Sequence, residues 1–500
     1  MEVLINAIPY LFIAVPIVIL IINNLLPASV TDKYGVRGGM ILAVTNFAAA
    51  AVEFILLAAS GKNEVRFSIF WDYTEKISSN NGAYINAAYF RVNLITLFLM
   101  ACIGIVMFAS NLVAEETVTK KRGSYLNAII TLTLGMNGML IVTDLFSLYV
   151  FLEIVGISSF VLISIFKTQK GLEGAFKYLA MSSFATILIL FGLSFLFMTN
   201  ESLTYESLKS LTIKPDGADG NGGAFLSYIA LAALTAGFAI KAGAAPFHSW
   251  LPDAHQSADT SISILLSGIV IKIAGIYGLI VLTDLFSEVY AIRLSLAVIG
   301  VFTIMFGALL AMRQKHFKRI CAYSSVSQMG YILLGLSAGS KLGLIGALYH
   351  IFSHAVFKSI LFTNAAALHE RLHTLEIDEM GGLGNVMPTT SFSSIVAFLS
   401  TAGIPPFSGF WSKLLIVLAL WGSGAKVLGG AALIISIFTA AYFLRLQKKV
   451  FFGVTNEKWR TVREVGGSIL AGEIVLTAFT IIGGVAFPLV LLLLSGTGLM

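Results

Sequence analysis

Long apolar runs constrain the fold of this chain more than any other feature of its sequence. The hydrocarbon core of a bilayer is roughly 30 Å thick, so a helix needs about 20 apolar residues to cross it. The chain contains about fourteen such runs. They cover residues 5–26, 38–59, 92–113, 125–143, 145–166, 176–198, 225–255, 260–283, 291–312, 320–338, 343–368, 390–421, 428–447 and 467–494. We therefore expect an all-α polytopic membrane protein with about 14 transmembrane helices.

The composition agrees with a chain dissolved in lipid. Of its 500 residues 57% are hydrophobic and 12% are charged, whereas a soluble domain has about a quarter charged residues. The net charge of +6 does not indicate nucleic-acid binding, because the basic residues lie in short loops between the spans. The first run lacks a basic n-region and contains Pro9 and Pro16, which favours a retained helix over a signal peptide.

The loops differ in their basic content, which predicts the orientation. Loops after odd-numbered spans hold about nineteen Lys and Arg, and the other loops about nine. The first set should be cytoplasmic, so an even number of spans places both termini on the outer face of the cytoplasmic (inner) membrane. The polar stretches 61–90 and 200–224 are then external loops.

The two cysteines exclude some redox and metal sites. Cys102 and Cys321 are far apart and form no CxxC motif, so the chain can build neither an iron–sulfur cluster nor a cysteine-based zinc site. We expect no cofactor in this chain. Any redox chemistry would belong to a partner chain, and whether the chain is part of an enzyme stays open.

Several charged residues lie inside the apolar runs. A charge at the middle of a membrane costs about 3 kcal/mol even on a lenient scale, so such residues are functional candidates. They are Lys241, Lys272, Lys358, Lys413, Glu53, Glu153 and Glu473. The alternative is that they form structural ion pairs. No motif gives Glu53 or Glu473 a partner, so these two are not placed in the predicted proton path.

Glu153 and two of the lysines have no route to either membrane surface. Glu153 is flanked by apolar residues and requires a cationic partner. Lys241 belongs to a span interrupted by Gly243 and Pro246, where unwound backbone is tolerated only if protein or water surrounds it. Lys272 lies in the middle of its span, too far from the ends to snorkel.

Three polar residues in the run 343–368 repeat every four positions. His350, His354 and Lys358 should lie on one helical face, about 6 Å apart per step. This spacing suits a proton relay. Two histidines at i and i+4 also fit a metal site, although no HExxH motif or nearby cysteine supports one. Core histidines that bond to neighbouring backbone are the third interpretation.

A second interrupted span resembles the first. Pro405 and Pro406 break the run 390–421 shortly before Lys413, about 160 residues after the first break. Matched discontinuous helices in two halves of a transporter point to an ion site. A buried lysine loses its proton more readily than a free one, and a neighbouring carboxylate opposes that loss. Changing the distance from Glu153 to Lys241 would therefore change the lysine's proton affinity.

These residues stand in motifs that resemble one known family. The motifs are LEIVGISSF around Glu153, FAIKAGAAPFHSWLPDAH around Lys241, LLSGIVIKIAGIYGL around Lys272, KRICAYSSVSQMGY at 318–331, HIFSHAVFKSILF around His354 and GIPPFSGFWSK around Lys413. Over about residues 90 to 450 the chain is similar to the antiporter-like membrane subunits of respiratory complex I, membrane-bound hydrogenases and Mrp-type cation/proton antiporters.

The resemblance implies a fold and a role for each site residue. It implies fourteen helices with two inverted five-helix repeats, each holding one broken helix. Within the single membrane domain 1–500, this gives helices 1–3 (1–124), a first repeat (125–283), a second repeat (291–447) and helix 14 (467–494). Glu153 and Lys241 resemble the coupling pair, Lys272 the central relay, Lys413 the terminal exchange residue, and His350, His354 and Lys358 the link between the halves.

The chain also departs from the family pattern. Gly243 stands where the family often has proline, and Ser257-Ala258-Asp259-Thr260 replaces a proline-rich start of the eighth helix. The sequence stops soon after its last apolar run, so it is expected to lack the lateral arm of the largest members.

An ion path without a redox site favours a proton-translocating subunit of a redox-driven complex. Its expected partners are the lipid bilayer and other membrane subunits, including related antiporter-like chains, but no nucleic acid. Iron–sulfur, flavin or NiFe centres are expected only in partner subunits. The alternative is a subunit of an Mrp-type Na⁺/H⁺ antiporter without redox coupling, and whether sodium is carried stays open. A structural anchor with inactive polar residues is the third hypothesis.

Overall fold

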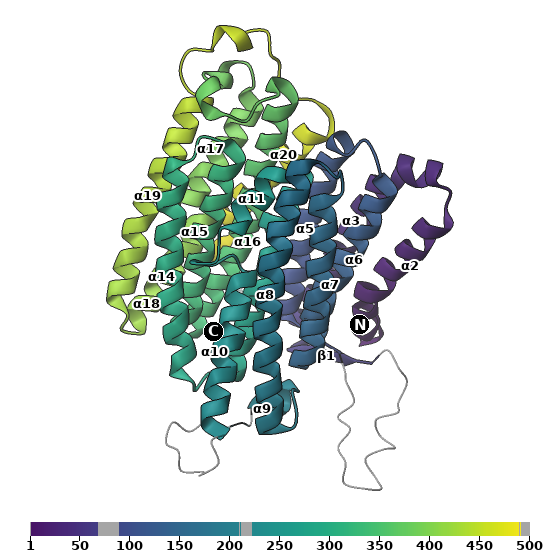
Figure 1. The fold of residues 1–500 in the computed structure, drawn as a ribbon, viewed down its shortest axis with the longest axis vertical. Helices are drawn as coiled ribbons and strands as arrows, with labels where there is room; N and C mark the ends of the chain where they lie inside the picture. Colours follow the sequence, from purple (N-terminus) through teal and green to yellow (C-terminus); the bar gives the residue numbers. More distant parts are fainter. Residues whose placement is uncertain (1, 69–89, 210, 212–222, 490, 492–500) are drawn as a thin grey trace.

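The computed structural model is a bundle of long helices and describes residues 2–68, 90–209, 211, 223–489 and 491. Figure 1 shows the helices running side by side, with the N-terminus near one end of the bundle. The longer helices are α2 (Leu11–Leu25), α3 (Ala28–Ser60), α5 (Leu94–Thr117), α6 (Arg122–Ile141), α7 (Leu145–Ser164), α8 (Gln169–Asn200), α10 (Gly223–Lys241), α14 (Tyr290–Arg313), α15 (Phe317–Ser337), α16 (Lys341–Leu372), α17 (Pro388–Ala402), α18 (Ser408–Gly422), α19 (Lys426–Val450) and α20 (Gly467–Val485). The shorter ones include α1 (Glu2–Ala7), α9 (Tyr205–Lys209), α11 (Trp250–Ser257), α12 (Thr260–Leu265) and α13 (Gly278–Leu285).

Within the described residues, twelve helical stretches are long and apolar enough to cross a membrane. This confirms an all-α, multi-pass membrane architecture. α15 is not among the twelve, and its sequence contains two basic residues and several serines. α17 and α18 are each 15 residues long, because a break divides the run that contains them.

Two spans are interrupted inside the bundle. α10 ends at Lys241, and Gly243 then adopts a left-handed φ of 71° before α11 begins at Trp250. α17 ends at Ala402, and Gly403 adopts a φ of 81° before α18 begins. Left-handed backbone suits glycine because it lacks a Cβ. Each break has a buried side, with Ala244 and Ala245 at the first and Ser408 at the second, and an exposed side that includes Phe247 at the first and Ile404 at the second.

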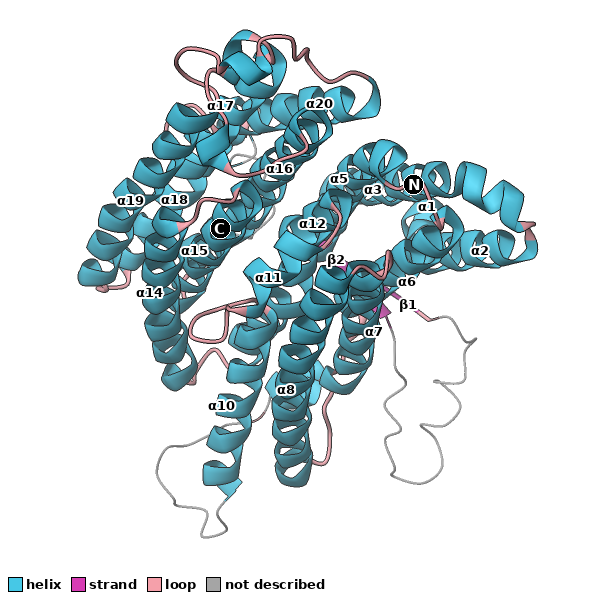
Figure 2. Ribbon diagram, turned by 45° about the horizontal axis from the view of Figure 1, so that its top comes forward, coloured by secondary structure: helices cyan, strands magenta, loops and turns pink. Residues whose placement is uncertain are grey.

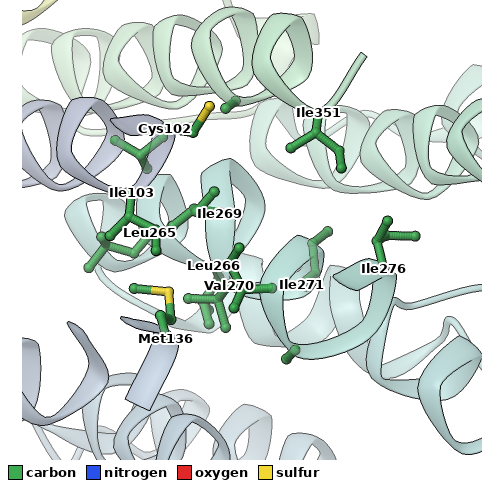
Figure 3. Packing of buried hydrophobic residues seen from close by; sticks show 14 of the residues in the cluster. Cys102, Ile103, Met136, Leu265, Leu266, Ile269, Val270, Ile271, Ile276 and Ile351 are labelled. Carbon is green, nitrogen blue, oxygen red and sulfur yellow. The ribbon is translucent and has the colours of Figure 1, made fainter. Parts of the chain in front are cut away.

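The most enclosed span runs through the centre of the molecule. The most apolar window of Thr260–Leu285 is entirely buried, and its middle consists of two π-helical segments, η2 (Leu266–Val270) and η3 (Lys272–Tyr277). Figure 3 shows apolar side chains from α5, α6 and α16 packed around this segment. π-helical turns are rare and occur frequently at functional sites. The apolar sequence pattern did not predict them.

One close approach joins this central span to the first break. A Cβ added to Gly275 would lie 2.3 Å from the backbone nitrogen of Ala242, the residue that follows α10. Only glycine permits this contact between η3 and the end of α10.

The helices form two neighbouring groups linked by α16. Figure 2 shows α7, α8 and α10 on one side of the bundle and α14, α15, α18 and α19 on the other. α16 contacts α15, α17, α18 and α20 in the second group, and also α5 and α12. Residues on α16 can therefore reach both groups.

Some segments differ from the predicted elements or fall outside the described residues. β1 (Glu64–Phe67) and α9 lie in stretches that were predicted only as loops. β2 (Phe90–Asn93), which pairs antiparallel with β1, extends into the predicted span 92–113. Most of the two predicted external loops, 69–89 and 212–222, lies outside the described residues, as do parts of the last predicted span beyond residue 489.

Candidate functional site

Glu153 and Lys241 meet beside the first helix break. Glu153 projects from α7, and Lys241 Nζ lies 3.2 Å from its Oε1. Lys241 Nζ also donates to Ser182 Oγ at 2.7 Å, and Thr186 Oγ1 donates to Glu153 Oε1 at 2.6 Å. The lysine side chain is 4% exposed and the glutamate side chain 30%. The ion pair is thus buried on its lysine side, with hydroxyl partners from α8 on both members.

A small cavity lies between Lys241 and the central span. Its volume is about 10 Å³, roughly the space for one water molecule. Lys241 and Ser182 line one part of it, and Val270 and Ile271 line another. The cavity therefore reaches from the ion pair to the residues directly before Lys272.

Lys272 is fully buried and bonds to the carbonyls of its own span. Its Nζ donates to the backbone oxygens of Ser267 and Gly268. Ser267 Oγ lies 2.7 Å from Ser325 Oγ on α15. In the described chain, no carboxylate lies within ion-pair distance of Lys272. Carbonyl dipoles and hydroxyls thus form its polar surroundings.

The two histidines of α16 lie one turn apart in the core, and both are fully buried. Their ring centroids are 6.4 Å apart. His350 Nδ1 lies 2.9 Å from Ser412 Oγ on α18, directly before Lys413. Both ring nitrogens of His354 are without a hydrogen-bond partner among the described residues. His354 can therefore accept or donate a proton without breaking an existing hydrogen bond.

Lys358 completes this face of α16. Its Nζ donates to Cys321 O at 3.0 Å and to Ser324 Oγ, both on α15. It also lies 5.5 Å from the centre of the Phe443 ring on α19, a cation–π distance. Lys358 therefore joins the α16 face to α15.

Lys413 lies beside the second break. Its Nζ donates to Thr401 O at 2.8 Å and to Ser436 Oγ at 3.2 Å. The Tyr331 ring centre is 4.4 Å away, and the same ring lies 5.8 Å from the His350 ring. Over the described residues, Lys413 has no carboxylate within 4.0 Å. Its partners are neutral, unlike those of Lys241.

The structure contains two further buried basic residues that were not predicted from the sequence. Lys318 was counted as a loop residue, but α15 begins at Phe317, and Lys318 is 5% exposed with Nζ 2.9 Å from Ala258 O. His255 is fully buried, its ring stacked on Phe362. His255 stands in the HSWLPDAH motif, and this motif could have indicated that His255 belongs to the site. Lys318 stands among other basic residues, so its charge alone did not distinguish it from the residues of a loop.

The described part of the chain contains no group of three His, Cys, Asp or Glu residues placed to hold a metal ion. The pair His350 and His354 therefore gains no further ligand from neighbouring helices. The serines, threonines and tyrosine around the lysines are suited instead to hydrogen-bond protonatable groups.

Comparison with known proteins identifies the family. The family model described as "NADH:quinone oxidoreductase/Mrp antiporter, TM" matches residues 142–439, which include both helix breaks and all seven residues of the predicted path. The chain belongs to this family. The NADH-quinone oxidoreductase subunit M of Rickettsia prowazekii is 30% identical over 442 residues, covering 87% of this chain and 86% of that protein.

A relative with a different name and a solved structure are also similar to this chain. A Na(+)/H(+) antiporter subunit of Alkalihalophilus pseudofirmus is 31% identical over 378 residues, 75% of each chain. A chain in the solved Mrp complex of Dietzia sp. superposes with a TM-score of 0.85 at 22% identity, over 99% of this chain and 97% of that one. The latter shows a shared fold. The family resemblance found in the motifs is thus confirmed.

Proposed function

We propose that this chain is a proton-translocating, antiporter-like subunit of a redox-driven membrane complex related to complex I. The observation that supports it best is the Lys241–Glu153 ion pair at a helix break, 3.2 Å long. Such an ion pair favours the charged lysine, and its opening lowers the lysine's proton affinity. Movement of the first break would therefore load or release a proton.

The proposed path runs from this pair through the bundle. Lys272 follows across the small cavity, then His354 and His350 on α16, and Lys413 exchanges the proton at the second break. Lys358, on the same face of α16, belongs to this link between the halves and also bonds to α15. The two spans are interrupted by glycine and proline residues, which are Gly243 and Pro246 in the first span and Pro405 and Pro406 in the second. The energy comes from partner subunits that hold iron–sulfur, flavin or NiFe centres, because this chain has no cysteine motif for a cluster.

The finer architecture belongs to the same proposal. α15 and the α17/α18 pair also cross the membrane, which gives fourteen spans in two inverted repeats, 125–283 and 291–447. Both termini lie on the outer face of the inner membrane. A terminal tag that is protected from external protease in right-side-out vesicles would contradict this orientation.

A subunit of an Mrp-type Na⁺/H⁺ antiporter is the second candidate, favoured by the similarity to the antiporter subunit of Alkalihalophilus pseudofirmus. Sealed vesicles containing the assembled complex separate the two. A pH gradient that forms only with an electron donor supports the redox-driven complex. Proton flux driven by a sodium gradient without a donor supports the antiporter. Replacing Lys241 by Ala should abolish either activity at normal assembly.

A further inference from the structure

A second group of polar residues lies where α16 ends and α17 begins, away from the lysines described above. Glu473 on α20 is fully buried, and its Oε2 lies 3.1 Å from Thr390 Oγ1 on α17. The same hydroxyl lies 2.7 Å from Oε1 of Glu464, which precedes α20 and is partly exposed. One threonine hydroxyl thus bridges a buried and an accessible carboxyl group.

The two carboxyl groups differ in the hydrogen-bond donors that surround them. A hydroxyl has one proton to donate, so Thr390 cannot donate to both. Glu464 Oε2 also accepts from the backbone nitrogens of Thr389 at 2.7 Å and Thr390 at 3.3 Å, in the first turn of α17. Backbone N–H groups at a helix N-terminus favour an ionised carboxylate. Glu464 is therefore the carboxylate that accepts the hydrogen bond from Thr390 Oγ1.

Glu473 has the opposite surroundings. Its Oε1 has no hydrogen-bond partner in the described part of the chain, and no cation lies within 4.0 Å of it there. A buried carboxylate without donors is costly, and protonation removes that cost. As a neutral acid, Glu473 supplies the proton for its own contact with Thr390 Oγ1.

We propose that Glu473, Thr390 and Glu464 form a proton-exchange site that connects the aqueous surface with the interior of the second repeat. In the transfer, Glu473 gives its proton to Thr390 Oγ1 while the threonine proton passes to Glu464. The O–H bond of Glu473 breaks and one forms on Glu464, so the charge moves from Glu464 to Glu473. The reverse step reloads Glu473. This inference rests on the proposed proton-translocating function.

The site touches the helix that holds the relay residues. Asn364 on α16 donates to Thr390 O at 2.7 Å and to Ser393 Oγ at 3.0 Å. It follows Lys358 by six residues, about 9 Å along the helix axis. Asn364 therefore connects Thr390 of the site to α16, one to two turns from Lys358.

Other charges around α20 leave Glu473 without a counter-ion. Glu116 on α5 accepts a hydrogen bond from the backbone nitrogen of Ser468 at 2.6 Å. From the end of α16, Arg371 donates to the backbone oxygen of Glu464 at 3.2 Å, and Glu370 lies beside Arg371. α17 contains no charged residue and α18 only Lys413. The site therefore loads and releases a proton and does not hold a fixed ion pair.

Two measurements on the assembled complex test the proposal. Infrared difference spectra of wild type and Glu473→Gln should show one protonated-carboxyl C=O band that the variant lacks and that shifts in D₂O. In sealed vesicles Glu473→Gln should lower proton translocation at least tenfold, because an amide has nearly the same shape but cannot exchange the proton. Glu473→Asp should retain part of the activity.

Matched variants separate exchange from packing. Thr390→Val removes the bridge and should slow translocation at least fivefold, whereas Thr390→Ser keeps the hydroxyl and should recover most of it. Thr477→Val, at a buried position one turn further along α20, should leave the rate unchanged. If Glu473→Gln fails to assemble, the translocation rates of Thr390→Val and Thr390→Ser are compared to test the proposal.

The proposal is overturned if the band is absent from wild type, or if Glu473→Gln or Thr390→Val translocates at the wild-type rate. The Lys241→Ala variant separates failure of this site from failure of the proposed function. If the chain does not translocate protons, Lys241→Ala will also work at the wild-type rate. If only the Glu473 site is wrong, Lys241→Ala will be inactive.

Discussion

The two helix breaks both present a lysine, but the lysines have different partners. Lys241 is the last residue of α10 and pairs with the Glu153 carboxylate at 3.2 Å. Lys413 lies after the second break and bonds to a backbone carbonyl, a serine hydroxyl and a tyrosine ring. One lysine is held by an opposite charge, while the other is surrounded by neutral dipoles.

Under the proposed function, this difference gives the two breaks different tasks. A carboxylate partner makes the proton affinity of a lysine depend on the distance between them, so the first break can respond to movement. Lys413 has only neutral hydrogen-bond partners, so no ion pair has to break when it releases a proton. The breaks are alike in backbone but differ in electrostatics.

Removing each lysine should therefore affect stability unequally. Lys241→Met leaves Glu153 without its cation, and we expect a loss of about 2–3 kcal/mol, below the range for fully buried pairs because Glu153 is partly exposed. Lys413→Met leaves only neutral partners and should cost under about 1 kcal/mol. Thermal unfolding of the purified complexes measures the difference. Adding Glu153→Gln to Lys241→Met should recover part of the stability, and equal losses for the two single variants would contradict the comparison.

Giving Lys413 a carboxylate should make the second break resemble the first. Ser436→Asp places an acid where the hydroxyl now lies 3.2 Å from Lys413 Nζ. We expect the lysine to retain its proton and translocation to fall about tenfold, the effect of about 1.4 kcal/mol. Ser436→Asn is the control of equal size. Equal rates for Asp and Asn would show that the charge of Lys413 does not limit release.

The glycines at the breaks should respond through their backbone and their neighbours. Gly243→Ala and Gly403→Ala both place a side chain at a left-handed φ, which costs about 1–2 kcal/mol. The new Cβ at 403 would lie 3.0 Å from Lys413 Cδ, and that at 243 would lie 3.3 Å from Leu251 Cδ2. Gly403→Ala should therefore also slow translocation.

Gly61→Ala is the control for this effect, because Gly61 has a φ of 68° with open space around it. It should show the backbone cost without a change in translocation. If all three variants translocate equally, then the position of Lys413 at its break is not critical.

Removing single hydroxyl groups should give the smallest effects. Ser182→Ala deletes a partner of Lys241, and Ser412→Ala deletes the partner of His350. Each hydrogen bond contributes about 1 kcal/mol, so we expect translocation rates to fall about fivefold or less. Ser295, which is exposed and bonds only to its own helix at Ala291, provides the control. A tenfold or larger loss in Ser412→Ala would assign that serine a more direct role.

The apolar runs and the glycine and proline positions were sufficient to predict the fold class. Charges within apolar runs likewise pointed to Lys241, Lys272, Lys358 and Lys413. A charged residue in an apolar run is costly to bury, and its position can be read from the sequence alone. The motifs supplied the family. These features are local in the sequence, which is why they could be recognised without a structure.

Features that depend on how helices pack could not be predicted in this way. The hydroxyl partners Ser182 and Thr186 come from α8, and nothing in their local sequence distinguishes them from other serines and threonines in apolar helices. Glu473 had no evident partner in the sequence, because Thr390 is 83 residues away. Lys318 was assigned to a loop because its burial depends on where α15 begins.

Proton translocation by the Lys241→Met variant tests the central claim most directly. The assembled complex is reconstituted in sealed vesicles, and the pH change is followed after the driving reaction starts, with assembly checked by the amounts of copurifying subunits. We predict that translocation is abolished in Lys241→Met. A normally assembled variant that acidifies or alkalinises the vesicles at the wild-type rate would contradict a path that begins at the Glu153–Lys241 pair.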